Sequence, residues 1–180
     1  KETVHDPRLQ VELEQTLLGL KGAVRDLRAM INDLRPPSLI RFGLAKALQF
    51  YLEDFREKHP EILLETDLME DGSCLSEPER LSLFRIVQES LTNAAKHANA
   101  THMKVSLTCD VDRTVLNIYD NGNGFEISNN LVDYTLKGHF GLVGMKERAE
   151  AIGGTFSLLT APGEGTSIQV SVMVPEEVKL

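Results

Sequence analysis

Near the N-terminal end, apolar residues recur at alternating steps of four and three: Leu13, Leu17, Leu20, Val24, Leu27, Ile31 and Leu34. A period of 3.5 residues predicts a helix whose apolar seam packs against other helices. Asp6-Pro7 is typical of a helix start and Arg35-Pro36-Pro37 of a stop, so we expect one helix of about 28 residues, roughly 42 Å long. The seam favours self-association, as a hairpin or a dimer bundle, over packing within one chain.

After Pro37 the pattern changes to shorter helices and strands. Amphipathic stretches predict helices over residues 43–59, over Glu77–Ala98 and over Leu142–Ile152. Ser76 is placed to cap the second of these, with Pro78 in its first turn. Alternation or β-rich composition predicts strands over residues 62–69, 102–109, 114–120, 155–160 and 166–174. This order predicts an α+β fold, a two-layer α/β sandwich over residues 38–180, preceded by the N-terminal helix of residues 1–37.

Composition narrows the class of protein. The net charge of −8 and a pI near 5.1 argue against a nucleic-acid partner, which normally meets a basic face. The longest aliphatic run, Ile62–Leu64, is far short of the ~20 residues of a membrane span, so we expect no membrane contact in this segment. Cys74 and Cys109 lack metal-type spacing and indicate ordinary cysteines in a reducing cytoplasm. Because the sequence opens on Lys1, we expect it to be part of a longer protein.

The stretch QESLTNAAKHA, residues 88–98, carries unusual polar groups for a helix face. At 100° per residue, an apolar stripe faces the core: Phe84, Val87, Leu91, Ala94, Ala95 and Ala98. The opposite side gathers Glu89, Asn93, Lys96 and His97. Because Glu89, Asn93 and His97 are spaced one turn apart, they can project into one cleft. A solvated helix face is the alternative.

The strand that ends at Asp120 strengthens the first interpretation. Asp120 shares the parity of the core residues Leu116 and Ile118, so we expect its carboxylate to point inward and to need a donor. Gly122 and Gly124 follow, where a ligand can approach the backbone, although Asn-Gly also marks an ordinary turn. Further glycines recur every third residue where a helix begins, at Gly138, Gly141 and Gly144. Neither the dinucleotide-binding GxGxxG nor the P-loop pattern is present.

Taken together, these segments resemble the Bergerat-type ATPase fold shared by gyrase-type ATPases and sensor histidine kinases. ESLTNAAKHA resembles the N box, DNGNGF and GHFGLVGM the two glycine boxes, and GEGT the closing box. LRPPSLIRFGLAKAL and GLVGMKERAEAIGG are similar to sensor kinases of the nitrate-sensing and lipid-fluidity-sensing type. The resemblance implies a mixed sheet of about five strands with three helices, ATP and Mg²⁺ as ligands, and transfer of the γ-phosphoryl group to a histidine.

The resemblance also implies roles for individual residues. Asn93 would ligate Mg²⁺, Glu89 would orient or deprotonate the reacting group, and Lys96 and His97 would offset phosphate charge. Asp120 would accept a hydrogen bond from the adenine amino group, and Thr166 would support the base through its hydroxyl. The remaining nucleotide-binding positions lie in the glycine boxes: Gly122, Gly124, Gly141, Leu142 and Gly144. For Lys137 and His139, in the presumed lid, phosphate contact and simple exposure stay open.

The phosphoacceptor is a separate question. His5-Asp6 followed by Gln10 matches the family's acceptor pattern, but the heptad helix leaves no room after His5 for a turn and a second helix. We therefore expect residues 1–37 to be the second helix of a dimerisation hairpin, with the acceptor upstream, and the fragment to bind ATP without labelling itself. By resemblance, the partners are a second copy and a response regulator with a helix-turn-helix output.

Three other functions fit the sequence less well. A non-catalytic, ATP-gated interaction module is disfavoured by the presence of both Glu89 and Asn93. An anti-sigma-type serine kinase is disfavoured by the heptad helix and the LRPP junction. Gyrase-like and chaperone ATPases are disfavoured because the stretch between Phe125 and Gly141 is too short for their larger lids.

Overall fold

The computed structural model describes residue 16 and residues 36–126 and 140–174. The chain divides into two units, residues 1–37 and residues 38–180. The predicted heptad helix, its self-association and the candidate acceptor His5 lie outside the described residues, which include only Thr16, Pro36 and Pro37 of the first unit. Lys137, Gly138 and His139 also lie outside them.

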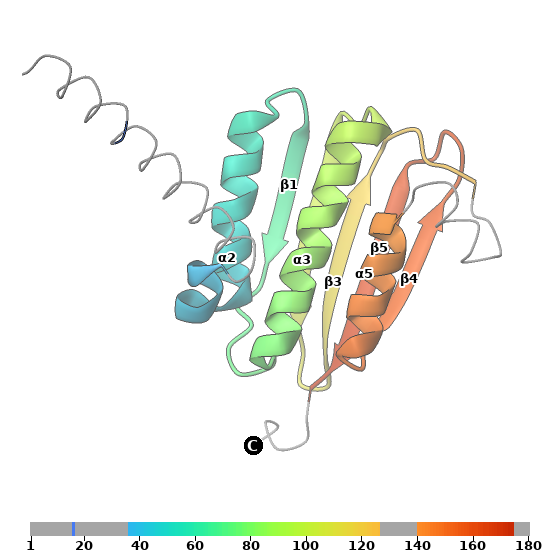
Figure 1. Cartoon of the computed structure of the whole chain (residues 1–180). Helices are drawn as coiled ribbons and strands as arrows, with labels where there is room; N and C mark the ends of the chain where they lie inside the picture. Colours follow the sequence, from blue (N-terminus) through green and yellow to red (C-terminus); the bar gives the residue numbers. More distant parts are fainter. Residues whose placement is uncertain (1–15, 17–35, 127–139, 175–180) are drawn as a thin grey trace, which may run out of the picture. The chain divides into compact units, whose positions relative to one another are not determined.

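The second unit alternates helices with strands (Figure 1). Its helices are α2 (Pro37–Lys58), α3 (Glu77–Asn93), the π-helix η1 (Ala94–Ala98) and α5 (Phe140–Ala151). Its strands are β1 (Leu63–Leu68), β2 (His102–Cys109), β3 (Arg113–Asp120), β4 (Thr155–Thr160) and β5 (Thr166–Met173).

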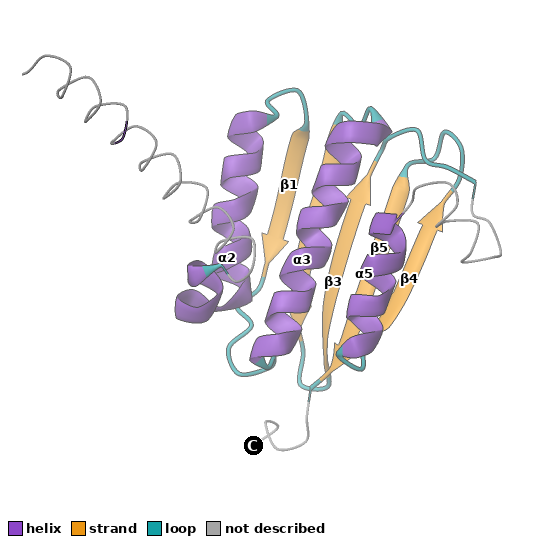
Figure 2. Cartoon of the chain, in the orientation of Figure 1, coloured by secondary structure: helices purple, strands orange, loops and turns teal. Residues whose placement is uncertain are grey.

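The five strands form one mixed sheet in the order β1-β2-β3-β5-β4. β1 and β2 are parallel because α3 returns the chain between them, whereas the other neighbouring strands are antiparallel. The helices α2, α3 and α5 all cover the same face of the sheet (Figure 2). The prediction of an α+β, two-layer sandwich with a mixed five-stranded sheet and three α-helices is therefore confirmed.

The alternation read from the sequence sets which side chains enter the core. On β2, Met103, Val105 and Leu107 are completely buried beneath the helices, and each burial contributes about 1.5–3 kcal/mol. The intervening positions lie on the other face, where Asn117 of β3 accepts a hydrogen bond from Gln169 of β5 at 2.8 Å. A one-residue slip would exchange these two faces, so the pattern fixes the register of the sheet.

The helix α2 begins earlier than the sequence predicts and contains a break at Gly43 (φ 79°, ψ −178°). The buried carboxylate of Asp71, from the loop after β1, accepts the Ala45 N–H at 3.0 Å just after this break. The same carboxylate pairs with Arg80 of α3, at 2.6 Å from Nε. Asp71 therefore caps the second part of α2 and joins it to α3.

The start of α3 agrees with the sequence. Ser76 is the N-cap, Pro78 lies in the first turn, and the Glu79 carboxylate accepts the Ser76 N–H as in a capping box. The predicted apolar stripe is buried, with Ala95 and Ala98 partly exposed at the far end.

The two cysteines, separated in sequence, come together at the ends of β1 and β2. The Asp71 carbonyl accepts the Cys74 N–H at 2.8 Å and lies 3.9 Å from Cys109 Sγ. Burial, together with the neighbouring Cys74 thiol, raises the pKa of Cys109 to about 11. Both thiols are free in the structure.

Candidate functional site

Asp120 ends β3 with its side chain in the core layer, as its parity predicts. It is 8% exposed, and its Oδ1 accepts the Gly122 N–H at 2.8 Å. Thr166, its direct partner on β5, donates to it through both the backbone N–H and the hydroxyl. Burial raises the pKa of Asp120, while these hydrogen bonds partly offset the rise. The site thus contains a carboxylate held in a poorly solvated position with its orientation fixed.

The loop after Asp120 is fastened to the end of η1 and to the start of β2. Asn123 donates its N–H to the Ala98 carbonyl at 2.7 Å. The Asn121 side chain accepts the N–H groups of Thr101 and His102 at 3.0 and 2.9 Å. A Cβ on Gly122 would lie 2.5 Å from Ala98 Cβ, which shows how closely the loop approaches the helix.

The position of Gly124 tolerates only a residue without a side chain. Its φ is +56°, and a Cβ there would lie 2.0 Å from the Ala161 carbonyl oxygen. Any other residue would be strained and would push the loop away from the β4–β5 hairpin. Gly124 therefore shapes the loop beside Asp120.

The polar flank of α3 faces the beginning of α5. Glu89 and Asn93, both half-buried, lie one α-helical turn apart. A Cβ placed on Gly141 would lie 2.0 Å from Glu89 Oε1 and 3.3 Å from Asn93 Nδ2. The structure therefore brings Glu89, Asn93 and Gly141 together, as their shared site predicts.

The sequence prediction of one α-helix over Glu77–Ala98 is wrong in its last turn. Residues Ala94–Ala98 form a π-helix, in which i→i+5 hydrogen bonds widen the turn. The spacing of 100° per residue therefore ends at Asn93, and it no longer places His97 in line with Glu89 and Asn93. Lys96 and His97 are both exposed.

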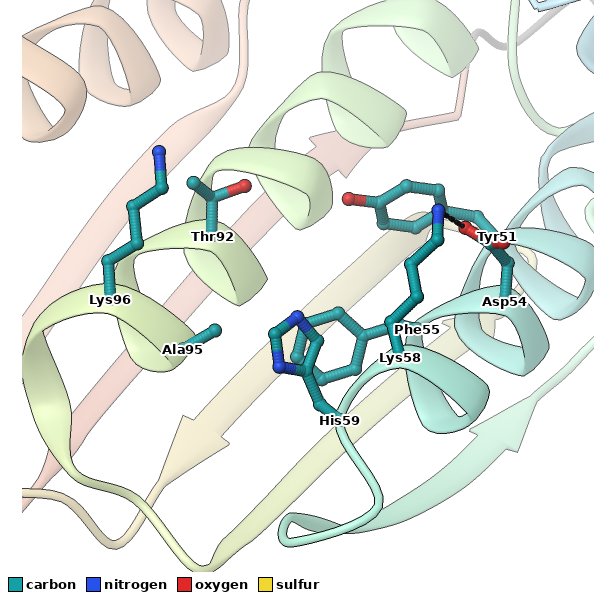
Figure 3. A pocket seen from close by; sticks show the side chains of 8 residues that line it. All are labelled: Tyr51, Asp54, Phe55, Lys58, His59, Thr92, Ala95 and Lys96. Atoms are coloured by element: carbon teal, nitrogen blue, oxygen red, sulfur yellow. Dashed lines mark hydrogen bonds and ion pairs between the residues drawn. The ribbon is translucent and has the colours of Figure 1, made fainter.

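Lys96 borders a cavity between α2 and the end of α3 (Figure 3). The cavity has a volume of about 340 Å³ and is lined by Tyr51, Asp54, Phe55, Lys58, His59, Thr92, Ala95 and Lys96. The rings of Phe55 and His59 stack at 4.5 Å, and Lys58 pairs with Asp54 at 2.6 Å. Of the candidate site residues named from the sequence, only Lys96 is among those lining it.

The two other predicted positions lie on α5. Leu142 packs half-buried against the hydrophobic core. Gly144 lies under the guanidinium group of Arg148, with its ideal Cβ 3.2 Å from Arg148 Nη1. Leu142 thus joins α5 to the core, whereas Gly144 leaves space on α5 for the Arg148 side chain one turn further on.

Residues 79–177, from the first turn of α3 through β5, match the model of the histidine kinase-, DNA gyrase B- and HSP90-like ATPases. The chain belongs to this ATPase family. The match covers Glu89, Asn93, Asp120, the glycine boxes and Thr166.

Sensor kinases are among the relatives of this chain. The chain is 35% identical over 158 residues to the signal transduction histidine-protein kinase/phosphatase DegS of Brevibacillus brevis, covering 88% of this chain and 39% of that protein. It is 37% identical over 156 residues to the sensor histidine kinase LiaS of Bacillus subtilis, covering 86% and 41%. The chain thus spans about two fifths of the length of these relatives.

Solved structures agree on the fold. The Acinetobacter baumannii histidine kinase AdeS superposes with a TM-score of 0.54 at 17% identity, over 97% of this chain and 88% of that one. The mycobacterial sensor histidine kinase MprB gives 0.51 at 21% identity, over 70% and 92%.

Two absences hold for the described part of the chain. Among those residues, no three His, Cys, Asp or Glu side chains are grouped so that they could hold a metal ion. Within the same ranges, no helix is long and apolar enough to cross a membrane.

Two residues beside the site were missed from the sequence. Asn121 anchors the Asp120 loop, and Thr160 of β4 contacts both the loop and the start of β5. Their functions rest on pairing between distant strands, which no local pattern reveals.

Proposed function

We propose that this ATPase-family chain is the ATP-binding catalytic part of a sensor histidine kinase. It would transfer the γ-phosphoryl group of ATP to a histidine of the full-length protein for relay to a response regulator. Support comes from the family match, from sensor kinases as relatives, and from the meeting of Glu89, Asn93 and Gly141. The alternative, a non-catalytic ATP-gated module, does not require a carboxylate at Glu89.

The observation that carries the proposal is the buried carboxylate of Asp120. A carboxylate in this position is costly unless donors reach it, and Thr166 and Gly122 supply only part of what it can accept. The adenine amino group would supply a further donor, while Thr166 would keep the carboxylate oriented. Gly122 would leave room for the base, because a Cβ there would lie 2.8 Å from Asp120 Oδ1. Gly124 would hold the loop beside the base, because a side chain there would collide with the Ala161 carbonyl.

The phosphate end of the nucleotide would lie between α3 and α5. Asn93 offers an amide oxygen, the type of ligand that suits Mg²⁺, which needs few protein ligands. When bound, Mg²⁺ would neutralise phosphate charge. Glu89, which faces the same gap, would orient or deprotonate the attacking group. Gly141 and Gly144, with Leu142, would set the approach of α5, and Lys96 and His97 would add positive charge at the edge.

Calorimetric titration with an ATP analogue tests the assignment. Replacing a hydrogen-bonded charge costs about 1.5–3 kcal/mol, so Asp120→Ala should weaken binding roughly ten- to a hundredfold. Asp67→Ala, an exposed carboxylate on β1, is the matched control and should leave the affinity unchanged. Equal affinities for Asp120→Ala and the parent protein would refute the proposed pocket.

The remaining parts of the proposal concern the whole protein. It would form a homodimer through the helix of residues 1–37, act in the cytoplasm where ATP is available, and have a response regulator with a helix-turn-helix output as partner. The acceptor histidine would lie upstream of this sequence. Acid-labile label on His5 after incubation with γ-labelled ATP would contradict that last point.

A further inference from the structure

Thr160 occupies a position that links the candidate adenine site to the β4–β5 hairpin. It is the last residue of β4 and pairs directly with Thr166, which in turn pairs with Asp120 on β3. Side chains of directly paired residues point to the same face of a sheet. Asp120, Thr166 and Thr160 therefore form a row across three neighbouring strands, on the face that the helices cover.

The Thr160 hydroxyl contacts the backbone on both sides of this row. It donates to the Gly165 carbonyl at 2.8 Å and accepts the Phe125 N–H at 3.2 Å. The Thr166 hydroxyl lies 3.4 Å away. Since a hydroxyl has one proton, the bond to Gly165 leaves the lone pairs of the Thr160 oxygen for the Phe125 N–H.

The bond to Gly165 bears directly on Asp120. The Gly165 carbonyl and the Thr166 N–H belong to one planar peptide unit, so fixing the carbonyl also fixes the direction of the N–H. That N–H donates to the Asp120 carboxylate. Gly165 also lies against the Asp120 backbone, since a Cβ on it would be 2.1 Å from the Asp120 carbonyl oxygen. A shift of this peptide therefore moves the carboxylate's partner.

The hydrogen bond from the Phe125 N–H to the Thr160 hydroxyl fixes the loop that follows Asp120. Phe125 follows Gly124 in the loop that begins at Asp120, and the loop's opposite end is tied to Ala98 and His102. Thr160 thus anchors the distal end of the same loop. One hydroxyl fixes both segments next to the carboxylate.

We propose that Thr160 is a positioning residue for purine recognition, acting through the Gly165–Thr166 peptide and the Phe125 backbone on Asp120. The inference rests on the proposed nucleotide site. Thr160 does not touch the nucleotide itself. Its effect should therefore fall on discrimination of the base more than on the phosphate contacts near α3 and α5.

The test compares the affinities of ATP and inosine triphosphate, which carries a carbonyl in place of the adenine amino group. Thr160→Val keeps the side-chain shape and removes the hydroxyl, so it should weaken ATP binding by roughly three- to tenfold while changing inosine triphosphate binding little. Thr160→Ser should restore the parent ratio. Thr155→Val, an exposed threonine at the other end of β4, is the control and should retain it.

A purely structural role would lower both affinities equally and leave their ratio unchanged, and that result would overturn the inference. Failure of Thr160→Ser to restore the ratio would do the same. Should Thr160→Val not fold, Thr160→Ala provides a second variant without the hydroxyl. Asp120→Ala belongs in the same series. If Asp120→Ala binds ATP like the parent protein, the proposed nucleotide site is wrong. If Asp120→Ala weakens ATP binding but Thr160→Val behaves like the parent protein, the site is supported and the proposed role of Thr160 is wrong.

Discussion

The two sides of α3 differ in a way that bears on function. Toward α5 the contact is close, because Gly141 has no room for a side chain beside Glu89. Toward α2 the helices leave a cavity of about 340 Å³. In Figure 1, β3 runs between α3 and α5, and β1 between α2 and α3. The tight side has Glu89 and Asn93, whereas Lys96 is the only candidate site residue among those that line the open side.

Helix chemistry explains the lining of the open side. The cavity lies at the C-terminal ends of α2 and η1, where backbone carbonyls concentrate partial negative charge. Lys58 and Lys96 are the kind of residues that offset this charge. The exposed pair Lys58–Asp54 adds little stability. The presence of a cavity between α2 and α3 therefore does not identify it as the nucleotide site. Because Gly141 lies close against Glu89, a nucleotide bound between α3 and α5 requires α5 to move away from Glu89.

The largest expected effect is a loss of stability on the α2 side of α3 without a loss of ATP affinity. Asp71→Ala would remove the carboxylate that contacts Arg80 Nε and the Ala45 N–H and should lower the free energy of unfolding by about 3 kcal/mol. ATP affinity of the folded fraction should be unchanged. Urea denaturation measures the first quantity, and Asp67→Ala, exposed on the adjoining strand, should change it by less than about 0.5 kcal/mol. A loss of affinity in the folded Asp71→Ala protein would erase the distinction between the two sides.

The second prediction enlarges one small residue on each side. Gly141→Leu should reduce ATP affinity by about a hundredfold, because its side chain would occupy the space between Glu89 and Asn93. Ala95→Leu should leave the affinity unchanged, since its side chain can enter the α2–α3 cavity. Calorimetry on both variants decides, and the reverse ranking would place the nucleotide on the α2 side.

The third prediction compares two polar residues near the end of α3. Asn93→Ala should remove the Mg²⁺ dependence of ATP binding and weaken it by about tenfold, as expected for loss of a metal ligand. Lys96→Ala should cost only about twofold and keep that dependence, since Lys96 is exposed beside the cavity. Titrations with and without Mg²⁺ measure both effects. Persistence of the Mg²⁺ dependence in Asn93→Ala would count against its role.

The smallest effect is a pH dependence centred on Asp120. Because burial raises its pKa, the folded protein holds this proton where the unfolded chain has lost it. Stability should therefore fall as pH rises through the folded-state pKa, and Asp120→Asn should remove that decline. ATP affinity should change the opposite way, falling roughly two- to threefold as the pH is lowered through the raised pKa of Asp120, since the proposed bond to adenine uses the ionised carboxylate. A flat affinity profile in the parent protein would contradict this.

Much of the fold was predictable because its signals are local. Alternation on β2, the parity of Asp120 and the capping box at Ser76 each depend on neighbours a few residues away. A buried face appears in the sequence as a periodic pattern of apolar residues, and a helix start appears as capping residues. The meeting of Glu89 with Gly141 followed from the resemblance, and the structure shows the contact.

The remaining features arise from tertiary contacts. The residues of the π-helix Ala94–Ala98 would equally suit an α-helix, so its sequence does not predict the wider turn. The π-helix ends where the Ala98 carbonyl accepts the Asn123 N–H of the Asp120 loop, a contact between distant residues. The capping of α2 by Asp71 joins residues 26 positions apart. Thr160 acts through strands paired across the hairpin. Hydrogen bonds between residues far apart in the chain produce no periodic pattern in the sequence, so the sequence does not predict them.

A structure of the chain with Mg²⁺ and a non-hydrolysable ATP analogue tests the central claim most directly. The account predicts the adenine amino group within hydrogen-bonding distance of the Asp120 carboxylate, with the phosphates between α3 and α5 and Gly141 displaced from Glu89. A nucleotide seated instead against Tyr51 and Phe55, in the cavity between α2 and α3, would contradict it.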